Sequence, residues 1–196
     1  MPHPFLDRPG WIFDMDGTLT VPVHDFAALR AQLGVPGQAD ILGWVSGRPA
    51  AERARLLAEI DVWEAALADS AVAQADAIAL VDALRSRGAR LGVLTRNTRA
   101  TALRTLRAAG WLDAFAPEDV LGRDEAAAKP APDGLHHLGA RWGLDPSSLV
   151  MVGDYVYDAR AGRAAGAATV LVLRADDRGW EGEADVLLRD LSELVR

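Results

Sequence analysis

The sequence predicts an α/β fold, a doubly wound parallel sheet that is interrupted early by a small all-helical insertion. Apolar runs alternate with helical patterns over most of the chain, and strands that alternate with helices pair in parallel. These runs are continuous rather than alternating, which is typical of strands buried on both faces. Residues 22–75, in contrast, contain no convincing strand. We therefore expect a core formed by residues 1–21 and 76–196, with residues 22–75 inserted as a helical cap.

The individual elements follow from apolar periodicity and from helix stop signals. The first strand ends at Phe13, directly before a turn that contains two aspartates. Three helices are expected in the cap, at Asp25–Leu33, Gln38–Val45 and Ala50–Leu67. Later strands are expected at Ala89–Leu94, Ser148–Val152, Ala168–Leu173 and Asp185–Leu188. Core helices are expected at Ala77–Arg87, Thr98–Ala109, Pro132–Gly143 and Tyr157–Ala165, with a short closing helix after the last strand.

Composition limits the class of protein. The chain has 196 residues, of which 50% are hydrophobic and 25% charged, as in a globular protein with a sizeable core. Its formal net charge is -7 and it has no basic run, so we expect no nucleic-acid partner. It contains no cysteine, and any metal must therefore bind oxygen or imidazole ligands.

The start of the chain lacks the pattern of a signal peptide, and no segment is apolar for long enough to span a bilayer. We therefore expect a cytoplasmic protein with no membrane partner. We also expect a monomer or a weak homodimer.

The motif Asp14-Met15-Asp16-Gly17-Thr18-Leu19 follows the first strand. Gly17 permits backbone angles closed to other residues, so the turn can direct Asp14 and Asp16 towards one pocket. Ligands of open α/β sheets bind beyond the carboxyl ends of the strands, where two acids suit a metal and a phosphate. A plain β-turn in which Asp and Gly supply only turn chemistry explains this stretch about as well.

Other polar residues follow later strands, and in a parallel sheet all of these strand ends meet at one edge. Thr95 follows the second strand of the core, Asp154 and Asp158 follow the third, and Lys129 lies between them, just before a helix. Taken singly, these residues are explained as a helix cap, an exposed charge and a helix start. Taken together and in this order, they favour a functional site.

The chemistry of these residue types fits a phosphate ester. Asp14 and Asp154, with a backbone carbonyl, provide the hard oxygen ligands that Mg²⁺ prefers. Mg²⁺ and Lys129 would neutralise the phosphate, so that an anionic carboxylate can approach it. The Thr95 hydroxyl and the amide groups that follow it suit phosphate oxygens.

These motifs resemble the signatures of the haloacid dehalogenase-like hydrolases. The four signatures correspond to Asp14–Leu19, Thr95, Lys129-Pro130, and Gly153 through Asp158. The cap is similar only in type, as a small helical insertion like that of phosphoglycolate phosphatase-like members. The resemblance implies a Rossmann-like core and a Mg²⁺-dependent phosphatase acting on a small organic phosphate ester, either phosphoglycolate-like or a sugar phosphate.

The resemblance also implies roles for the acidic residues. Asp14 would be the nucleophile that forms an aspartyl-phosphate. Asp16 would protonate the leaving group and then activate water, and its backbone carbonyl would bind the metal. Asp154 would complete the metal site, and Asp158 would bind the metal or orient its ligands.

Thr95 and Lys129 would hold the transferred phosphoryl group, together with Arg96 and Asn97. Three positions depart from the family pattern. Val21 replaces a common acid, Arg96 precedes Asn97 where relatives more often have Asn directly, and Tyr155 replaces a small hydroxyl residue. All three lie where substrate contacts occur, so the substrate does not follow from the resemblance.

In this family the cap loop contacts the leaving group, and the best candidate here is Ser46-Gly47-Arg48-Pro49. Arg48 can bind a carboxylate or a second phosphate through two hydrogen bonds. An exposed arginine in a turn between helices is an equally good interpretation. Trp44 lies near this loop.

Two other functions remain open at the level of sequence. A phosphomutase of the same family uses the same pair of aspartates. A non-catalytic module that binds phosphate or carries a phospho-aspartate also has an acid on a doubly wound sheet. The helical insertion and the second acid of the pair favour turnover.

Overall fold

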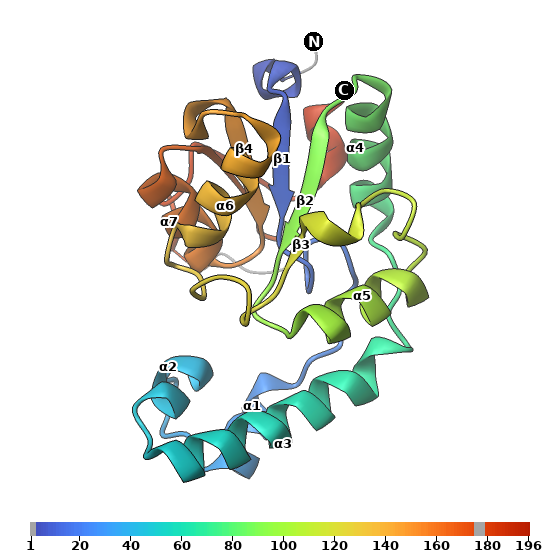
Figure 1. Ribbon diagram of the computed structural model, residues 1–196. Helices are drawn as coiled ribbons and strands as arrows, with labels where there is room; N and C mark the ends of the chain where they lie inside the picture. The colour runs from blue at the N-terminus through green and yellow to red at the C-terminus, as the bar shows by residue number, and fades with distance from the viewer. Residues whose placement is uncertain (1–2, 175–178) are drawn as a thin grey trace.

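The computed structural model describes residues 3–174 and 179–196 and confirms the α/β fold (Figure 1). Within these residues one six-stranded sheet has the order β3-β2-β1-β4-β5-β6, and every neighbouring pair is parallel. The strands are β1 Gly10–Phe13, β2 Arg90–Leu94, β3 Val120–Leu121, β4 Leu149–Gly153, β5 Ala168–Val172 and β6 Val186–Leu188. Because β1 is central, its last residue, Phe13, pairs with Val93 of β2 and Val152 of β4.

Helices cover both faces of the sheet. The core helices are α4 Ala75–Ser86, α5 Arg99–Ala108, α6 Asp133–Trp142 and α7 Val156–Ala165. Short 3-10 turns lie at Pro4–Asp7, Pro117–Asp119, Pro146–Ser148 and Leu191–Leu194. Alternate residues of a strand point to opposite faces, and β1 follows this rule: Trp11 and Phe13 pack in one cluster with α4 and α5, and Ile12 in another with α6 and α7. All three are fully buried, as the continuous apolar run predicts.

The inserted helices form a group beyond the carboxyl ends of β1 and β2 (Figure 1). They are α1 Phe26–Leu33, α2 Ile41–Ser46 and α3 Ala50–Ala68. The Asp25 side chain caps α1 at the Ala28 amide, and Gly34 ends this helix with φ +73°. The three helices share a hydrophobic cluster of their own, formed by Leu29, Leu33, Val35, Ile41, Val45, Leu56 and Ile60. The exact division of the chain into core and cap stays a prediction.

Every expected strand is present within one or two residues, but β3 was not predicted. Val120 and Leu121 are too few for a periodic signal, and they form a strand because they pair with Val93 and Leu94 at the sheet edge. The strand expected at Ser148–Val152 is β4, and its expected start was wrong by one residue. Pro146–Ser148 form a 3-10 turn, and the strand begins at Leu149. In the part of the chain described, none of the helices combines the length and the apolar character that crossing a bilayer needs.

Candidate active site

The turn after β1 brings its first aspartate to the edge of the sheet. The Asp14 amide donates to the Val152 carbonyl at 2.8 Å, which fixes Asp14 beside the end of β4. The amides of Thr18, Leu19 and Thr20 then all donate to the Met15 carbonyl, so the chain curls tightly. Gly17 has φ +86°, and a Cβ atom there would lie 2.3 Å from Asp154 Oδ2. Only glycine satisfies both the turn and this close approach.

Lys129 lies between two carboxylates. Its Nζ is 2.5 Å from Asp14 Oδ1 and 2.7 Å from Asp158 Oδ1, and the lysine side chain is 2% exposed. Burial disfavours the charged amine, but the charges of Asp14 and Asp158 outweigh burial and raise the pKa of Lys129. The amine is therefore a fixed positive charge beside Asp14, where it can attract an anionic phosphate group.

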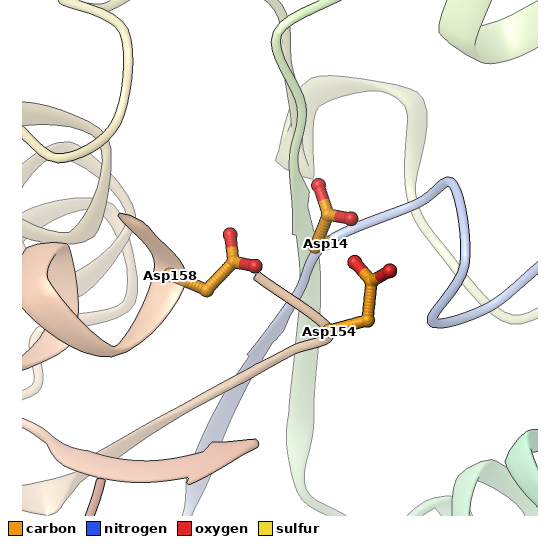
Figure 2. A group of neighbouring side chains, drawn as sticks. All are labelled: Asp14, Asp154 and Asp158. Carbon is orange, nitrogen blue, oxygen red and sulfur yellow. The ribbon is translucent and has the colours of Figure 1, made fainter. Parts of the chain in front are cut away.

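Asp14, Asp154 and Asp158 form a cluster of carboxylates (Figure 2). One oxygen of each lies within 4.8 Å of the others. Asp14 comes from the end of β1, Asp154 from the end of β4 and Asp158 from the first turn of α7. A set of oxygen donors without thiolate or imidazole fits a hard divalent cation. Asp158 has two further partners, Lys129 and the Tyr155 amide, which suit a residue that orients the others.

Asp16 lies in a different environment. Burial, followed by repulsion from Asp14, raises the pKa of Asp16 to about 7. Asn97 Nδ2 donates to Asp16 Oδ2 at 3.0 Å, and His24 Nδ1 lies 3.7 Å from Asp16 Oδ1. A carboxyl that exchanges its proton near neutral pH is suited to general acid and base chemistry.

The three residues after β2, Thr95 to Asn97, have different partners. Thr95 is buried, its amide donates to the Leu121 carbonyl, and its hydroxyl accepts from the Asn97 amide at 3.2 Å. Asn97 contacts Asp16, as described above. The Arg96 guanidinium instead forms an ion pair with Asp40 at 2.6 Å and stacks over the Tyr157 ring. The phosphate-binding roles assigned to these residues stay predictions.

The structure does not link Arg48 to the cluster at the strand ends. The Arg48 guanidinium lies 4.4 Å from the ring centroid of Trp44, and its Nε is buried without a hydrogen-bond partner. Among the described residues, no hydrogen bond or ion pair joins it to Asp14, Asp16 or Lys129. Its expected contact with the leaving group stays a prediction.

Sequence reasoning missed a buried acidic residue in the cap. Glu64 is buried in α3, and Arg123 Nη1 donates to its Oε2 at 3.0 Å. Burial raises the pKa of Glu64 to about 8, with a further contribution from Asp16. A signal was available, because Glu64 continues the buried stripe Leu56, Ile60, Glu64, Ala68, in which the other members are apolar. No comparable sequence signal was present for His24, whose Nδ1 lies 3.7 Å from Asp16 Oδ1.

A family model supports the interpretation of these residues as an active site. It describes a haloacid dehalogenase-like hydrolase and matches residues 10–166, a segment that includes Asp14, Lys129, Asp154 and Asp158. The chain belongs to this family. Its members are hydrolases, and the described site carries the acidic residues expected of one.

Curated relatives within the family are named as phosphatases. The chain is 32% identical to a validoxylamine A 7'-phosphate phosphatase of Streptomyces hygroscopicus over 93% of this chain and 94% of the relative. It is 31% identical to a phosphoglycolate phosphatase of Psychrobacter arcticus over 81% of this chain and 80% of the relative. The fold matches a hydrolase structure from Pseudomonas syringae with TM-score 0.79 and 23% identity, over 95% of both chains.

Proposed function

We propose that this hydrolase is a Mg²⁺-dependent phosphatase that cleaves a small organic phosphate monoester through an aspartyl-phosphate on Asp14. The observation that carries the proposal is the convergence of Asp14, Lys129, Asp154 and Asp158 at one sheet edge, with Asp16 beside them. The names of two relatives, which specify phosphoglycolate and validoxylamine A 7'-phosphate, support an organic phosphate ester as the substrate.

The proposed reaction has two steps. A carboxylate oxygen of Asp14 attacks phosphorus, the bond from phosphorus to the leaving oxygen breaks, and Asp16 gives its proton to that oxygen. Asp16, now ionised, takes a proton from water, the water oxygen bonds to phosphorus, and the bond to Asp14 breaks. Inorganic phosphate leaves and both aspartates return to their starting states.

Other residues hold the reacting groups. Lys129 offsets the charge of Asp14 and of the phosphoryl oxygens, and Thr95 offers them a hydroxyl. Mg²⁺ bound by Asp14, Asp154 and the main-chain carbonyl of Asp16 would neutralise the phosphoryl charge. Asp158 keeps Lys129 in place through their 2.7 Å contact.

Hydrolysis of para-nitrophenyl phosphate, with Mg²⁺ and with a chelator, tests this proposal. We expect phosphate release only with Mg²⁺, and we expect Asp14→Asn to lower the rate by at least about 10³-fold because the nucleophile is lost. Asp7→Asn, an exposed residue in the 3-10 turn before β1, is the matched control for loss of one carboxylate. A circular dichroism spectrum checks that the fold is retained.

Each alternative function gives a distinct result in the same experiment. Activity that persists in the Asp14 variant would exclude Asp14 as the nucleophile. A phospho-aspartate that accumulates without phosphate release would indicate a binding module. Transfer of phosphate to a second hydroxyl would indicate a phosphomutase, and this requires the assay to be repeated with a hexose phosphate because para-nitrophenyl phosphate has no other hydroxyl.

A further inference from the structure

Glu64 is an ionisable side chain on the buried stripe of α3. Its side chain is 8% exposed and shares this stripe with Leu56, Ile60 and Ala68. A buried carboxyl costs free energy unless it has partners, and Arg123 pairs with the Oε2 atom. Among the described contacts the second oxygen has no partner, so it is available to hydrogen-bond a ligand.

Hydrogen bonds connect both Glu64 and Asp16 to the short loop after β2 that contains Arg96 and Asn97. Arg123, which holds Glu64, also donates from Nη1 to the Arg96 carbonyl at 3.3 Å and from its amide to the Asn97 carbonyl at 3.0 Å. The Asn97 side chain in turn donates to Asp16. Arg123 and Asn97 therefore connect the Glu64 carboxyl of the cap to the proposed acid, and Asp16 contributes to the raised pKa of Glu64.

Aromatic rings also lie on the cap side of Asp16. The His24 ring, which lies next to Asp16, stacks on Phe26 at 5.4 Å and contacts Trp63 at 5.2 Å between ring centroids. Phe26 is 47% exposed. Rings beside a carboxyl offer apolar surface to the carbon skeleton of a ligand and a hydrogen-bonding group to its polar edge.

The cations at this contact are already paired. Two guanidinium groups join the cap to the loop region here: Arg96 pairs with Asp40, and Arg123 pairs with Asp61 and Glu64. Because both arginines have acidic partners, a leaving group that carries a carboxylate or a second phosphate would have to compete with these carboxylates for them. A neutral leaving group avoids this competition.

We propose that Glu64 is a specificity-determining residue that binds a hydroxyl or amino group on the leaving group of the phosphate ester. It selects polyol and amino-polyol phosphates over esters whose leaving group carries a carboxylate or a second phosphate. The inference rests on the proposed phosphatase activity and narrows its substrate class. A site built to hydrogen-bond one polar group discriminates strongly against analogues that lack it.

The test compares four substrates: glucose 6-phosphate, glucosamine 6-phosphate, 2-phosphoglycolate and para-nitrophenyl phosphate. The measured quantity is kcat/KM for each, relative to the value for para-nitrophenyl phosphate. We expect the wild-type chain to prefer the two sugar phosphates to 2-phosphoglycolate. We expect Glu64→Ala to lower the kcat/KM of each sugar phosphate, relative to that of para-nitrophenyl phosphate, by about tenfold to a hundredfold. This is the effect of losing a hydrogen bond to a charged group.

Two variants separate binding from structure. An ammonium group bound beside Glu64 favours the ionised carboxylate, a form that Glu64→Gln cannot adopt although it keeps the size of the side chain. The ratio should therefore fall more for glucosamine 6-phosphate than for glucose 6-phosphate. Asp69→Asn removes another cap carboxyl, one that is paired with Arg104 away from Glu64, and should leave all ratios unchanged. Thermal unfolding shows whether each variant is folded.

Three results would overturn the assignment. They are a preference of the wild-type chain for 2-phosphoglycolate, an equal loss on all four substrates in the Glu64 variants, and unchanged ratios in these variants. In each case the phosphatase proposal stands. If the wild-type chain hydrolyses none of the four esters, the phosphatase proposal fails and the assignment of Glu64 fails with it.

Discussion

Asp14 and Asp16 are two residues apart, yet their surroundings differ. Asp14 forms an ion pair with the Lys129 ammonium at 2.5 Å. Asp16 is buried and is repelled by Asp14, and its pKa is raised to about 7. A carboxyl with such a pKa suits proton transfer near neutral pH, which leaves Asp14 for attack on phosphorus.

This difference predicts a pH dependence that varies with the leaving group. Asp16 is protonated below its raised pKa and ionises as the pH rises through about 7, so its ability to protonate the leaving group is lost on the alkaline side. A bound cation would offset the charge of Asp14 and so weaken the repulsion that raises the pKa of Asp16. The loss of leaving-group protonation therefore begins at or below pH 7. For an alkyl ester, kcat/KM should then fall by about tenfold per pH unit. For para-nitrophenyl phosphate the fall should be shallower, because its leaving group needs little protonation.

The measurement is kcat/KM for glucose 6-phosphate and for the aryl ester between pH 5 and 9 at constant ionic strength. Asp16→Asn should remove the difference between the two profiles. Parallel profiles in the wild-type chain would contradict the assignment of Asp16 as the acid.

At the scale of elements, ion pairs connect the inserted helices to the core. The Arg123–Glu64 pair is buried on both sides, with each side chain 8% exposed, and Arg123 also pairs with Asp61. The Arg104–Asp69 pair lies at the surface. Removal of Arg123 leaves the Glu64 carboxyl and the Arg96 carbonyl without a hydrogen-bond donor, whereas a surface pair contributes little.

Arg123→Ala should therefore lower the free energy of unfolding by about 1 to 3 kcal/mol. Arg104→Ala, which removes the same side chain from a pair at the surface, should leave the unfolding midpoint in urea almost unchanged. The two variants can be compared by urea unfolding at pH 7 with tryptophan fluorescence as the signal. Equal midpoints for both would show that the buried pair does not stabilise the contact between cap and core.

Local sequence patterns predicted most elements but could not predict these pairs. Amphipathic periodicity identified α4 and α6, and continuous apolar runs identified β2 and β4. Arg96 and Asp40 are 56 residues apart, and Arg123 and Glu64 are 59 apart, so only the tertiary arrangement brings them together. The same holds for β3, which is a strand only because β2 lies beside it. For the candidate site, the order of polar residues at strand ends was informative because the topology of a parallel sheet collects them at one edge.

At the scale of the whole molecule, negative charge gathers where the strands end. The chain carries a net charge of -7, and three carboxylates lie within 4.8 Å of one another with a single buried lysine among them. Repulsion between these groups opposes folding, and a divalent cation bound there would relieve it. Ligand binding to the folded state alone stabilises that state by mass action.

Mg²⁺ should therefore raise the melting temperature of the wild-type chain without any substrate. At a free Mg²⁺ concentration ten times the dissociation constant, the stabilisation is about 1.4 kcal/mol, or about 3 to 6 °C for a chain of this size. Asp154→Asn removes one ligand and should reduce the shift several-fold. Asp7→Asn changes an exposed residue in the 3-10 turn before β1, at the other end of that strand from the cluster, and should keep the shift. Differential scanning fluorimetry across a Mg²⁺ series, with Na⁺ at matched ionic strength, separates specific binding from screening. An equal shift in wild type and Asp154→Asn would mean that Mg²⁺ binds elsewhere, because repulsion within this cluster can only be relieved by an ion that its carboxylates hold.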